Sequence, residues 1–306
     1  MSRLALLECG SNSLKVHFRS ALTGEYRALK LPWRLGRDVF ETGSLSVETM
    51  EQAIRTVHDL ERMGFARESL VAIATEGVRD ARNRADVIAQ LEERLGLKVR
   101  IVTGREEASL LAEGYLKEHG RIPAFLADIG GGSLQLVHIS QEKTVLRDSL
   151  PLGAIRLHFL GDEEGKPWNR RFVEEFIEGQ FETACLMQTD EIHATGGTVK
   201  AAAKVLGKRG MPRAELEALL ERSAVDGPPL ELKPTRREIF LPGLLVLVRL
   251  AQRTGAKMVN QVSVSVGAVF LERMLERLGS GTGGAGSERK GLVLDQLRIT
   301  NIRPRL

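Results

Sequence analysis

A short pattern that occurs twice constrains the fold of this chain more than any other feature. Each copy consists of an apolar run, an acidic residue, a turn rich in Gly and Ser, and a second run with apolar residues; the copies are residues 4–18 and 124–139. The acidic residues, Glu8 and Asp128, are 120 positions apart. Two such runs joined by a tight turn indicate a β-hairpin, and the recurrence predicts an internal duplication of one fold.

The rest of the chain alternates between segments typical of strands and segments typical of helices. Ser46 is a candidate N-cap for a helix that runs to Met63, and residues 75–80 are expected to form a loop after a buried strand at 70–74. This alternation predicts an α/β fold. Further strands are expected at 99–102, at 143–149 and from 192, and further helices at 85–95, 106–117, 213–222, 239–253, 266–278 and from 199.

The length of 306 residues suggests two domains of roughly 150 residues each. We expect them at 1–120 and 121–278, because Pro123 begins the second copy of the pattern. Residues 279–306 are expected to form a Gly/Ser-rich linker and a basic tail, since five basic and two acidic residues follow position 286. The tail accounts for most of the net charge of +4.

Composition excludes several classes of protein. A nearly neutral body argues against binding to duplex nucleic acid, and the aromatic content of 5% argues against a stacking platform for single strands. The sequence has no apolar stretch long enough for a membrane span and no signal-peptide pattern. Its two cysteines cannot form a disulfide framework, so we expect a cytoplasmic protein.

Three glycine-rich turns follow apolar strands, and each could hold a phosphate group. Glycine permits a close approach of the backbone and lets several N–H donors converge on an anion. The third turn also precedes a helix, whose N-terminus favours an anion. Neither P-loop nor dinucleotide-binding spacing is present. The turns are Gly10-Ser11-Asn12-Ser13, Gly130-Gly131-Gly132-Ser133 and Gly196-Gly197-Thr198.

Motifs in one order along the chain, from about residue 4 to 278, resemble those of the Ppx/GppA phosphatases, which are the exopolyphosphatases and guanosine pentaphosphate phosphohydrolases. The resemblance implies the actin-like ATPase fold (sugar kinase/acetate kinase-like), with two related domains around a cleft. Longer members of the family carry an extra C-terminal hydrolase domain, and we expect this sequence to be the short form without it. The motifs are residues 10–13, 74–81, 103–108, 128–133, 149–156 and 194–200.

The resemblance implies the removal of a terminal phosphoryl group by water, from inorganic polyphosphate or from guanosine pentaphosphate. Mg²⁺ is the implied cofactor, and a homodimer is the expected assembly. Glu107 is implied as the base that orients the attacking water, and Arg79 and Lys200 would contact phosphate together with the three turns. The implied metal-side residues are Asp128, Glu8 and Gln135.

Several positions depart from the family's pattern. Glu8 stands where the family has aspartate, and Gln135 stands where it has glutamate, so fewer anions would surround a cation. Ser265-Val266-Gly267 replaces Arg-Glu-Gly, and Asn260-Gln261 replaces Ser-Asp. A weak or inactive relative that binds polyphosphate or phosphorylated guanine nucleotides as a sensor is therefore a second hypothesis. An ATP-dependent kinase of the same fold superfamily is the third.

Each assigned residue also has a purely structural interpretation. Glu106 and Glu107 can favour the positive end of a helix, and Arg79 and Lys200 can be solvated surface charges. Cys9 is interpreted as a packing residue. The six histidines show no metal-ligand spacing.

Overall fold

The computed structural model describes residues 4–20, 23–33, 35–141, 144–162 and 167–279, which form two compact units. The first unit comprises the described residues up to Glu106 and those from Ser265 to Gly279, and the second is Glu107–Val264. The sequence places the division at residue 120, whereas the structure places it in the first turn of helix α5 and returns helix α12 to the first unit. The expected tail, 280–306, lies outside the described residues.

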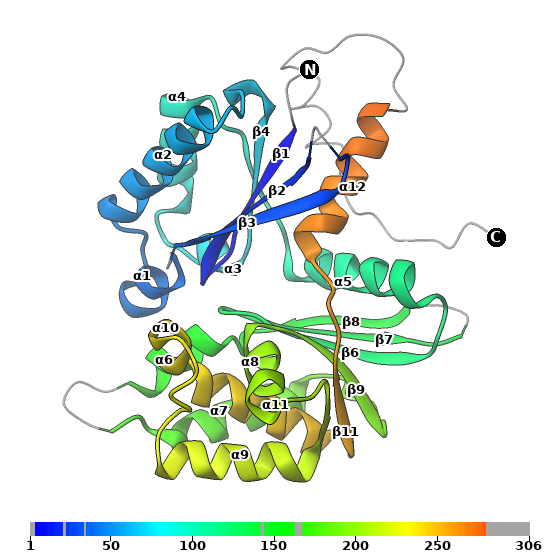
Figure 1. Cartoon of the computed structure of the whole chain (residues 1–306). Coiled ribbons are helices and arrows are strands. Elements are labelled where there is room, and N and C mark those ends of the chain that lie inside the picture. Colours follow the sequence, from blue (N-terminus) through cyan, green and yellow to red (C-terminus); the bar gives the residue numbers. More distant parts are fainter. Residues whose placement is uncertain (1–3, 21–22, 34, 142–143, 163–166, 280–306) are drawn as a thin grey trace. The chain divides into compact units, whose positions relative to one another are not determined.

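The first unit contains a five-stranded sheet in the order β3-β2-β1-β4-β5. Figure 1 labels β1 to β4 of this sheet. Strands β1, β2 and β3 are antiparallel neighbours, whereas β4 and β5 run parallel to β1. The elements are β1 (Ala5–Cys9), β2 (Ser13–Arg19), β3 (Tyr26–Pro32), α1 (Leu35–Thr42), α2 (Val47–Arg62), the 3₁₀ helix η1 (Arg67–Ser69), β4 (Leu70–Ala74), α3 (Glu76–Arg79), α4 (Arg84–Leu95), β5 (Val99–Ile101), the start of α5 (Gly104–His119) and α12 (Val266–Gly279).

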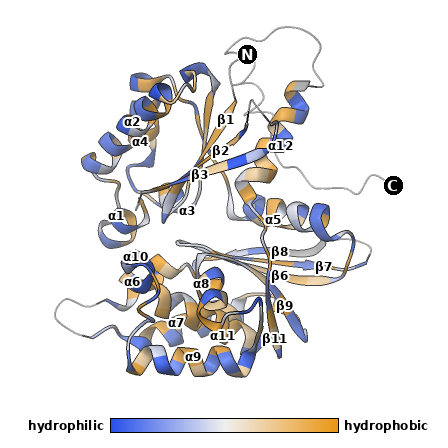
Figure 2. Cartoon of the chain, viewed as in Figure 1, coloured by the Kyte–Doolittle hydropathy of each residue, from blue (hydrophilic) through white to orange (hydrophobic). Residues whose placement is uncertain are grey.

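Side chains of β1 alternate between the two faces of the first sheet, as expected for a strand. Ala5, Leu7 and Cys9 belong to one buried cluster with apolar residues of α2 and α4. Both helices also have hydrophilic stretches (Figure 2). The face that carries Leu6 and Glu8 is the one on which α12 contacts β1 and β2. The acidic residue of the first pattern therefore lies under α12.

The second unit contains a six-stranded sheet in the order β8-β7-β6-β9-β11-β10. Strands β6, β7 and β8 are antiparallel neighbours, β9 runs parallel to β6, and β11 runs parallel to β9. The elements are β6 (Ala124–Ile129), β7 (Leu134–Ile139), β8 (Thr144–Leu150), α6 (Ala154–Gly161), α7 (Arg170–Thr183), β9 (Glu191–Gly196), α8 (Gly197–Leu206), β10 (Gly210–Pro212), α9 (Arg213–Val225), α10 (Pro234–Arg237), α11 (Phe240–Arg253) and β11 (Met258–Gln261).

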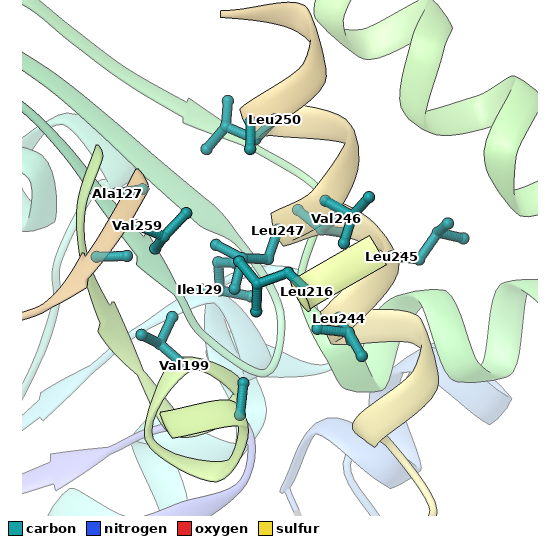
Figure 3. Close-up of a cluster of buried hydrophobic side chains, with 14 of the residues drawn as sticks. Ala127, Ile129, Val199, Leu216, Leu244, Leu245, Val246, Leu247, Leu250 and Val259 are labelled. Carbon is teal, nitrogen blue, oxygen red and sulfur yellow. The ribbon is translucent and has the colours of Figure 1, made fainter. Parts of the chain in front are cut away.

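Helices cover both faces of the second sheet. Leu111 and Tyr115 of α5 pack on the face that carries Leu126 and Val137. The other face packs against the mostly hydrophobic helix α11 and its neighbours (Figure 2). Leu244, Leu247 and Leu250 of α11 belong to one buried cluster with Ile129 of β6 and Val259 of β11, and Figure 3 labels all five. The first face also carries Asp128, because side chains alternate along β6.

Five strands of each sheet share one order and one set of directions, which confirms the expected duplication, and the edge strand β10 is an addition in the second sheet. In each, the first three strands form an antiparallel meander, and the next two strands of the sheet join the other side of the first strand in parallel. Parallel neighbours need a crossover between them, and helices provide it in both units.

Most segments expected from sequence are confirmed within one to three residues, including Ser46 as the N-cap of α2, whose side chain accepts from Thr49 N. The loop expected at 75–80 is wrong, because Glu76–Arg79 form helix α3. Within the described ranges, no helix combines the length and the hydropathy needed to cross a membrane.

Candidate functional site

Loops after the parallel strands of the first unit meet at one edge of its sheet. Cys9, Ala74 and Ile101, the last residues of β1, β4 and β5, are neighbours in register. The segments that follow are the Gly10–Ser13 turn, helix α3 and the start of α5. Ligands bind at the carboxyl ends of such strands in open α/β sheets, so this edge is the candidate site of the first unit.

The Gly10–Ser13 turn is closed by a hydrogen bond from Gly10 N to Ser13 O (3.2 Å), and Gly36 N of α1 donates to Ser11 O (2.8 Å). The N–H groups of Ser11 and Asn12 donate to no described residue. Ser11 itself is buried, and a Cβ on Gly36 would lie 2.7 Å from its Cβ. The backbone N–H groups of Ser11 and Asn12 are therefore the candidate donors to a phosphate, whereas the Ser11 side chain packs against Gly36.

Arg79 is held at the same edge by two partners. Its guanidinium donates to the Glu76 carboxylate and to the carbonyl of Val102, just past β5. Only about a fifth of the side chain is exposed. Because α3 carries it from the end of β4 toward the end of β5, Arg79 is fixed where the loops meet and is not a freely solvated charge.

Glu8 is buried and fully engaged within the first unit. Lys15 Nζ lies 2.5 Å from its Oε1, and His17 Nε2 lies 2.9 Å from its Oε2. Burial by itself would raise the pKa of Glu8, but the Lys15 ammonium and the His17 ring outweigh burial and hold this pKa well below its ordinary value. Burial of the Cys9 thiol and the negative charge of Glu8 together raise the pKa of Cys9 to about 12.

The Gly130–Ser133 turn of the second unit is held from one side by helix α6. Donors at the start of α6 bind all three glycine carbonyls: Ala154 N to Gly130 O (3.1 Å), Ile155 N to Gly131 O (2.8 Å) and Arg156 Nε to Gly132 O (3.0 Å). A Cβ on Gly153 would lie 2.2 Å from Gly132 C, so only glycine permits this approach. The N–H groups of Gly131, Gly132 and Ser133 donate to no described residue.

The third turn lies beside Asp128, at the carboxyl end of β9. Gly196 has φ +104°, and a Cβ there would lie 2.3 Å from the Ile129 carbonyl oxygen and 2.9 Å from Asp128 Oδ1. Glycine is needed both for the dihedral angle and for the close approach. The register pairs Ile129 with Gly196, so the second and third turns share one edge of the second sheet.

Gly197, Thr198 and Lys200, at the start of α8, differ from one another in their surroundings. A Cβ on Gly197 would lie 2.4 Å from Nη2 of Arg236, and burial lowers the pKa of this arginine. Thr198 Oγ1 is buried against Gly243 of α11 and has no hydrogen-bond partner among the described residues. Lys200 is exposed on α8. Of the residues expected to bind phosphate here, the two glycines lie at the helix start, and Thr198 is turned into the core.

The two adjacent glutamates of α5 have separate surroundings. Glu106 Oε2 accepts from Thr103 N (2.8 Å) and Thr103 Oγ1 (3.0 Å), while Glu106 N donates to Thr103 Oγ1 (3.2 Å). This arrangement is a capping box, completed by Arg100 on Oε1. Glu107 is buried. The structural interpretation fits Glu106, which leaves Glu107 as the candidate base.

Asp128 and Gln135 face each other across β6 and β7 on the sheet face that α5 covers. Gln135 is buried, and its amide donates to Ser133 Oγ (2.7 Å) and Ser149 Oγ (3.1 Å). Among the described residues, no group of three or more His, Cys, Asp or Glu is arranged to hold a metal ion. Mg²⁺ commonly uses one or two carboxylates together with substrate phosphates. Asp128 fits such a shared site, whereas the occupied carboxylate of Glu8 does not.

Several residues that shape the site escape sequence reasoning. Lys15 and His17 alternate with apolar residues on β2, and only the strand register shows that they meet Glu8. Arg236 is 39 positions from Gly197 in sequence and carries no local signal. Gly267 lies beside Glu8 and His17, and its position in the altered Ser-Val-Gly segment is the one signal that could have pointed to it.

Comparisons with known proteins identify the family of this chain. The model of the Ppx/GppA phosphatase family matches residues 27–259. Exopolyphosphatase 1 of Mycobacterium tuberculosis is 30% identical over 165 residues, covering 51% of this chain and 47% of that protein. That of Mycobacterium leprae is 25% identical over 222 residues, covering 67% and 65%. The chain thus spans about half the length of the first curated relatives that it matches.

Solved structures show the same fold at low identity. The Aquifex aeolicus member of the Ppx/GppA family has a TM-score of 0.68 at 19% identity, covering 92% of this chain and 99% of that one. An exopolyphosphatase-like protein has a TM-score of 0.74 at 19% identity, covering 91% and 99%. These likenesses confirm the expected α/β fold, which this chain shares with solved Ppx/GppA structures.

Proposed function

Because the chain belongs to the Ppx/GppA phosphatase family, we propose that it hydrolyses the terminal phosphoanhydride of inorganic polyphosphate. The observation that carries the proposal is the pair of glycine turns, one at the end of the first strand of each sheet. The N–H groups of residues 11–12 and 131–133 in these turns donate to no described residue. Such groups suit phosphate oxygens, because glycine lets the backbone approach an anion closely.

The residues of this chain have distinct roles in the proposal. The turns at 10–13 and 130–133 and the start of α8 bind and orient phosphate, and Arg79 is held where its planar guanidinium can pair with phosphate oxygens. Glu107 accepts the proton of the attacking water and orients that water. Phosphoryl transfer depends mostly on such positioning and on charge stabilisation. Mg²⁺, when bound beside Asp128, supplies positive charge to the phosphate oxygens.

A binding protein for polyphosphate or guanosine pentaphosphate is the second candidate function. It is favoured by the pairing of Glu8 with Lys15 and by the uncharged Gln135 opposite Asp128. Both observations lower the negative charge available to a divalent cation, and both leave the glycine turns intact. A sensor would use the same phosphate contacts without turnover.

The deciding experiment measures phosphate release from long-chain polyphosphate and from guanosine pentaphosphate, each with Mg²⁺ and with EDTA. Binding of both compounds is measured in parallel by calorimetry. Release from polyphosphate that requires Mg²⁺ is the expected result. Tight binding without release from either compound would reject the hydrolase and support the sensor. Release only from the nucleotide would move the proposal to guanosine pentaphosphate.

A further inference from the structure

We propose that a basic groove beside helix α8 binds the part of a polyphosphate chain that lies beyond its terminal groups. The groove is a hollow of about 330 Å³ in the second unit, which is within the usual range for a ligand pocket. The basic residues that line it are Lys200, Lys204, Lys208 and Arg209. The inference rests on the proposed function, because it takes inorganic polyphosphate as the substrate.

One face of α8 forms the first part of the groove. Lys200, Ala203, Lys204 and Gly207 all line it and follow the i, i+3, i+4, i+7 spacing of a single helix face. Both lysines are exposed. Like charges four residues apart repel each other on a helix, and a bound polyanion would relieve this repulsion. At about 1.5 Å per residue the stripe is about 10 Å long, so it can contact more than one phosphate of a chain.

The groove lies at the edge of the second sheet that carries the second and third glycine turns. Gln261 lines the groove, is the last residue of β11, pairs with Ala194 of β9, and donates its N–H to Arg209 O (2.8 Å). Strand β9 ends in the third turn, and Lys200 follows Gly197 of that turn by about one turn of helix. A chain whose end is bound at the turn can therefore continue over Lys200 toward Arg209.

The positive charge of the groove is only partly compensated. Lys208 Nζ pairs with Glu215 Oε1 (2.7 Å), and Lys204 Nζ donates to a backbone carbonyl (3.2 Å). Lys200 and Arg209 have no ion-pair partner in the part of the chain that the structure describes. One carboxylate thus faces four cations, and a flexible polyanion is the ligand that complements such a surface along its length.

The lining of the groove favours a bare phosphate chain over a nucleic acid or a nucleotide. None of the described residues along it is aromatic, whereas proteins that bind single-stranded nucleic acids stack the bases on aromatic side chains. Ammonium and guanidinium groups donate charge-assisted hydrogen bonds to phosphate oxygens. Every contact that the groove offers is therefore one that phosphate alone can use.

Calorimetry of long-chain polyphosphate binding in EDTA, at several salt concentrations, tests the groove without turnover. In a polyelectrolyte each neutralised phosphate contact contributes about 0.7 to the dependence of log affinity on log salt concentration. The double variant Lys204→Gln/Arg209→Gln should therefore lower this slope by about 1.4 and weaken binding by about 25-fold at about 0.1 M salt.

The double variant Arg171→Gln/Lys257→Gln is the matched control. It removes the same amount of charge from the second unit, at two exposed cations that lie outside the groove and already form ion pairs. Binding should change by less than about threefold. An equal loss in both double variants, or no loss in the first, would overturn the proposal. So would a single-stranded RNA with as many phosphates that binds the parent as tightly as polyphosphate does.

Lysine acetylation of the parent, read by mass spectrometry, tests the groove without any substitution. Polyphosphate should protect Lys200 and Lys204 and leave Lys257 reactive; no protection would overturn the proposal. Phosphate release by the parent with Mg²⁺ is measured separately. Release without protection would reject the groove and keep the proposed hydrolase, whereas protection without release would reject the hydrolase and keep the groove.

Discussion

Gly267 offers a sensitive test of how the first unit is packed. A Cβ at this position would lie 2.2 Å from His17 Nε2 and 2.4 Å from Glu8 Oε2, far inside the usual separation of about 3.5–4.0 Å between non-bonded carbon atoms. His17 is fully buried and cannot swing aside. Gly267→Ala must therefore displace the start of α12 or break the bond between Glu8 and His17.

The expected change in the free energy of unfolding follows from two destabilising terms and one stabilising term. Overpacking in a close-packed site costs about 1–3 kcal/mol, and loss of a hydrogen bond to a charged group costs about 1.5–3 kcal/mol. Alanine gains at most about 1 kcal/mol over glycine in a helix. Since either displacement or bond breakage relieves the clash, we expect a net loss of about 1–3 kcal/mol. At about 2–4 °C per kcal/mol, the Tm should fall by about 2–12 °C.

Gly179 provides the matched control. It lies inside helix α7, and a Cβ there would meet nothing within 4 Å. Gly179→Ala should therefore raise the stability by about 0.5–1 kcal/mol. Both variants are melted by differential scanning calorimetry against the parent. If Gly267→Ala melts at or above the parent, the close contact of α12 with Glu8 and His17 is refuted.

Three further predictions concern the chemistry. Glu107→Gln should lower the rate of phosphate release by about 10²–10⁴-fold with little change in polyphosphate binding, whereas Glu106→Gln, which can keep the capping box, should remain active; equal rates in both variants would reduce Glu107 to a helix-end carboxylate. Gln135→Glu should lower the Mg²⁺ concentration for half-maximal release, since a second carboxylate would face Asp128; an unchanged Mg²⁺ curve would contradict this. A thiol reagent at pH 8 should modify one cysteine of the folded chain and two after unfolding, because Cys185 is exposed and the raised pKa of Cys9, about 12, keeps its thiol protonated; two modified thiols in the folded chain would contradict the burial of Cys9.

Elements with a strong local signal could be predicted from the sequence. The strands at 5–9, 70–74 and 124–129 are apolar runs that end at polar or glycine-rich turns, and the structure confirms them. Strand β3 was missed because it lies at the edge of its sheet, where most of its side chains are exposed and no apolar run marks it. Helix α7 was also missed, although Val173, Ile177 and Phe181 repeat every four residues.

The features of the candidate site also differ in whether a local sequence signal marks them. Glycine turns are visible because their chemistry is local: the residues that make the turn are consecutive. The charge state of Glu8 depends on Lys15 and His17, and the surroundings of Gly197 depend on Arg236. These contacts arise from strand register and from packing between distant segments, neither of which a single sequence encodes in a short window. The roles of Glu107, Arg79 and the turns in turnover stay predictions until they are measured.

The return of α12 to the first unit has a consequence for biosynthesis. The face of the first sheet that carries Leu6 and Glu8 receives this helix only after residues 107–264 have been made. The second unit is one continuous segment inserted between the two segments of the first unit. Closing a loop of this length slows the formation of native contacts between those two segments. During translation one face of the first sheet should therefore stay unprotected until helix α12 leaves the ribosome. Ribosome-bound chains that stop before residue 265 should be cleaved readily by protease within residues 4–106, while the second unit already resists.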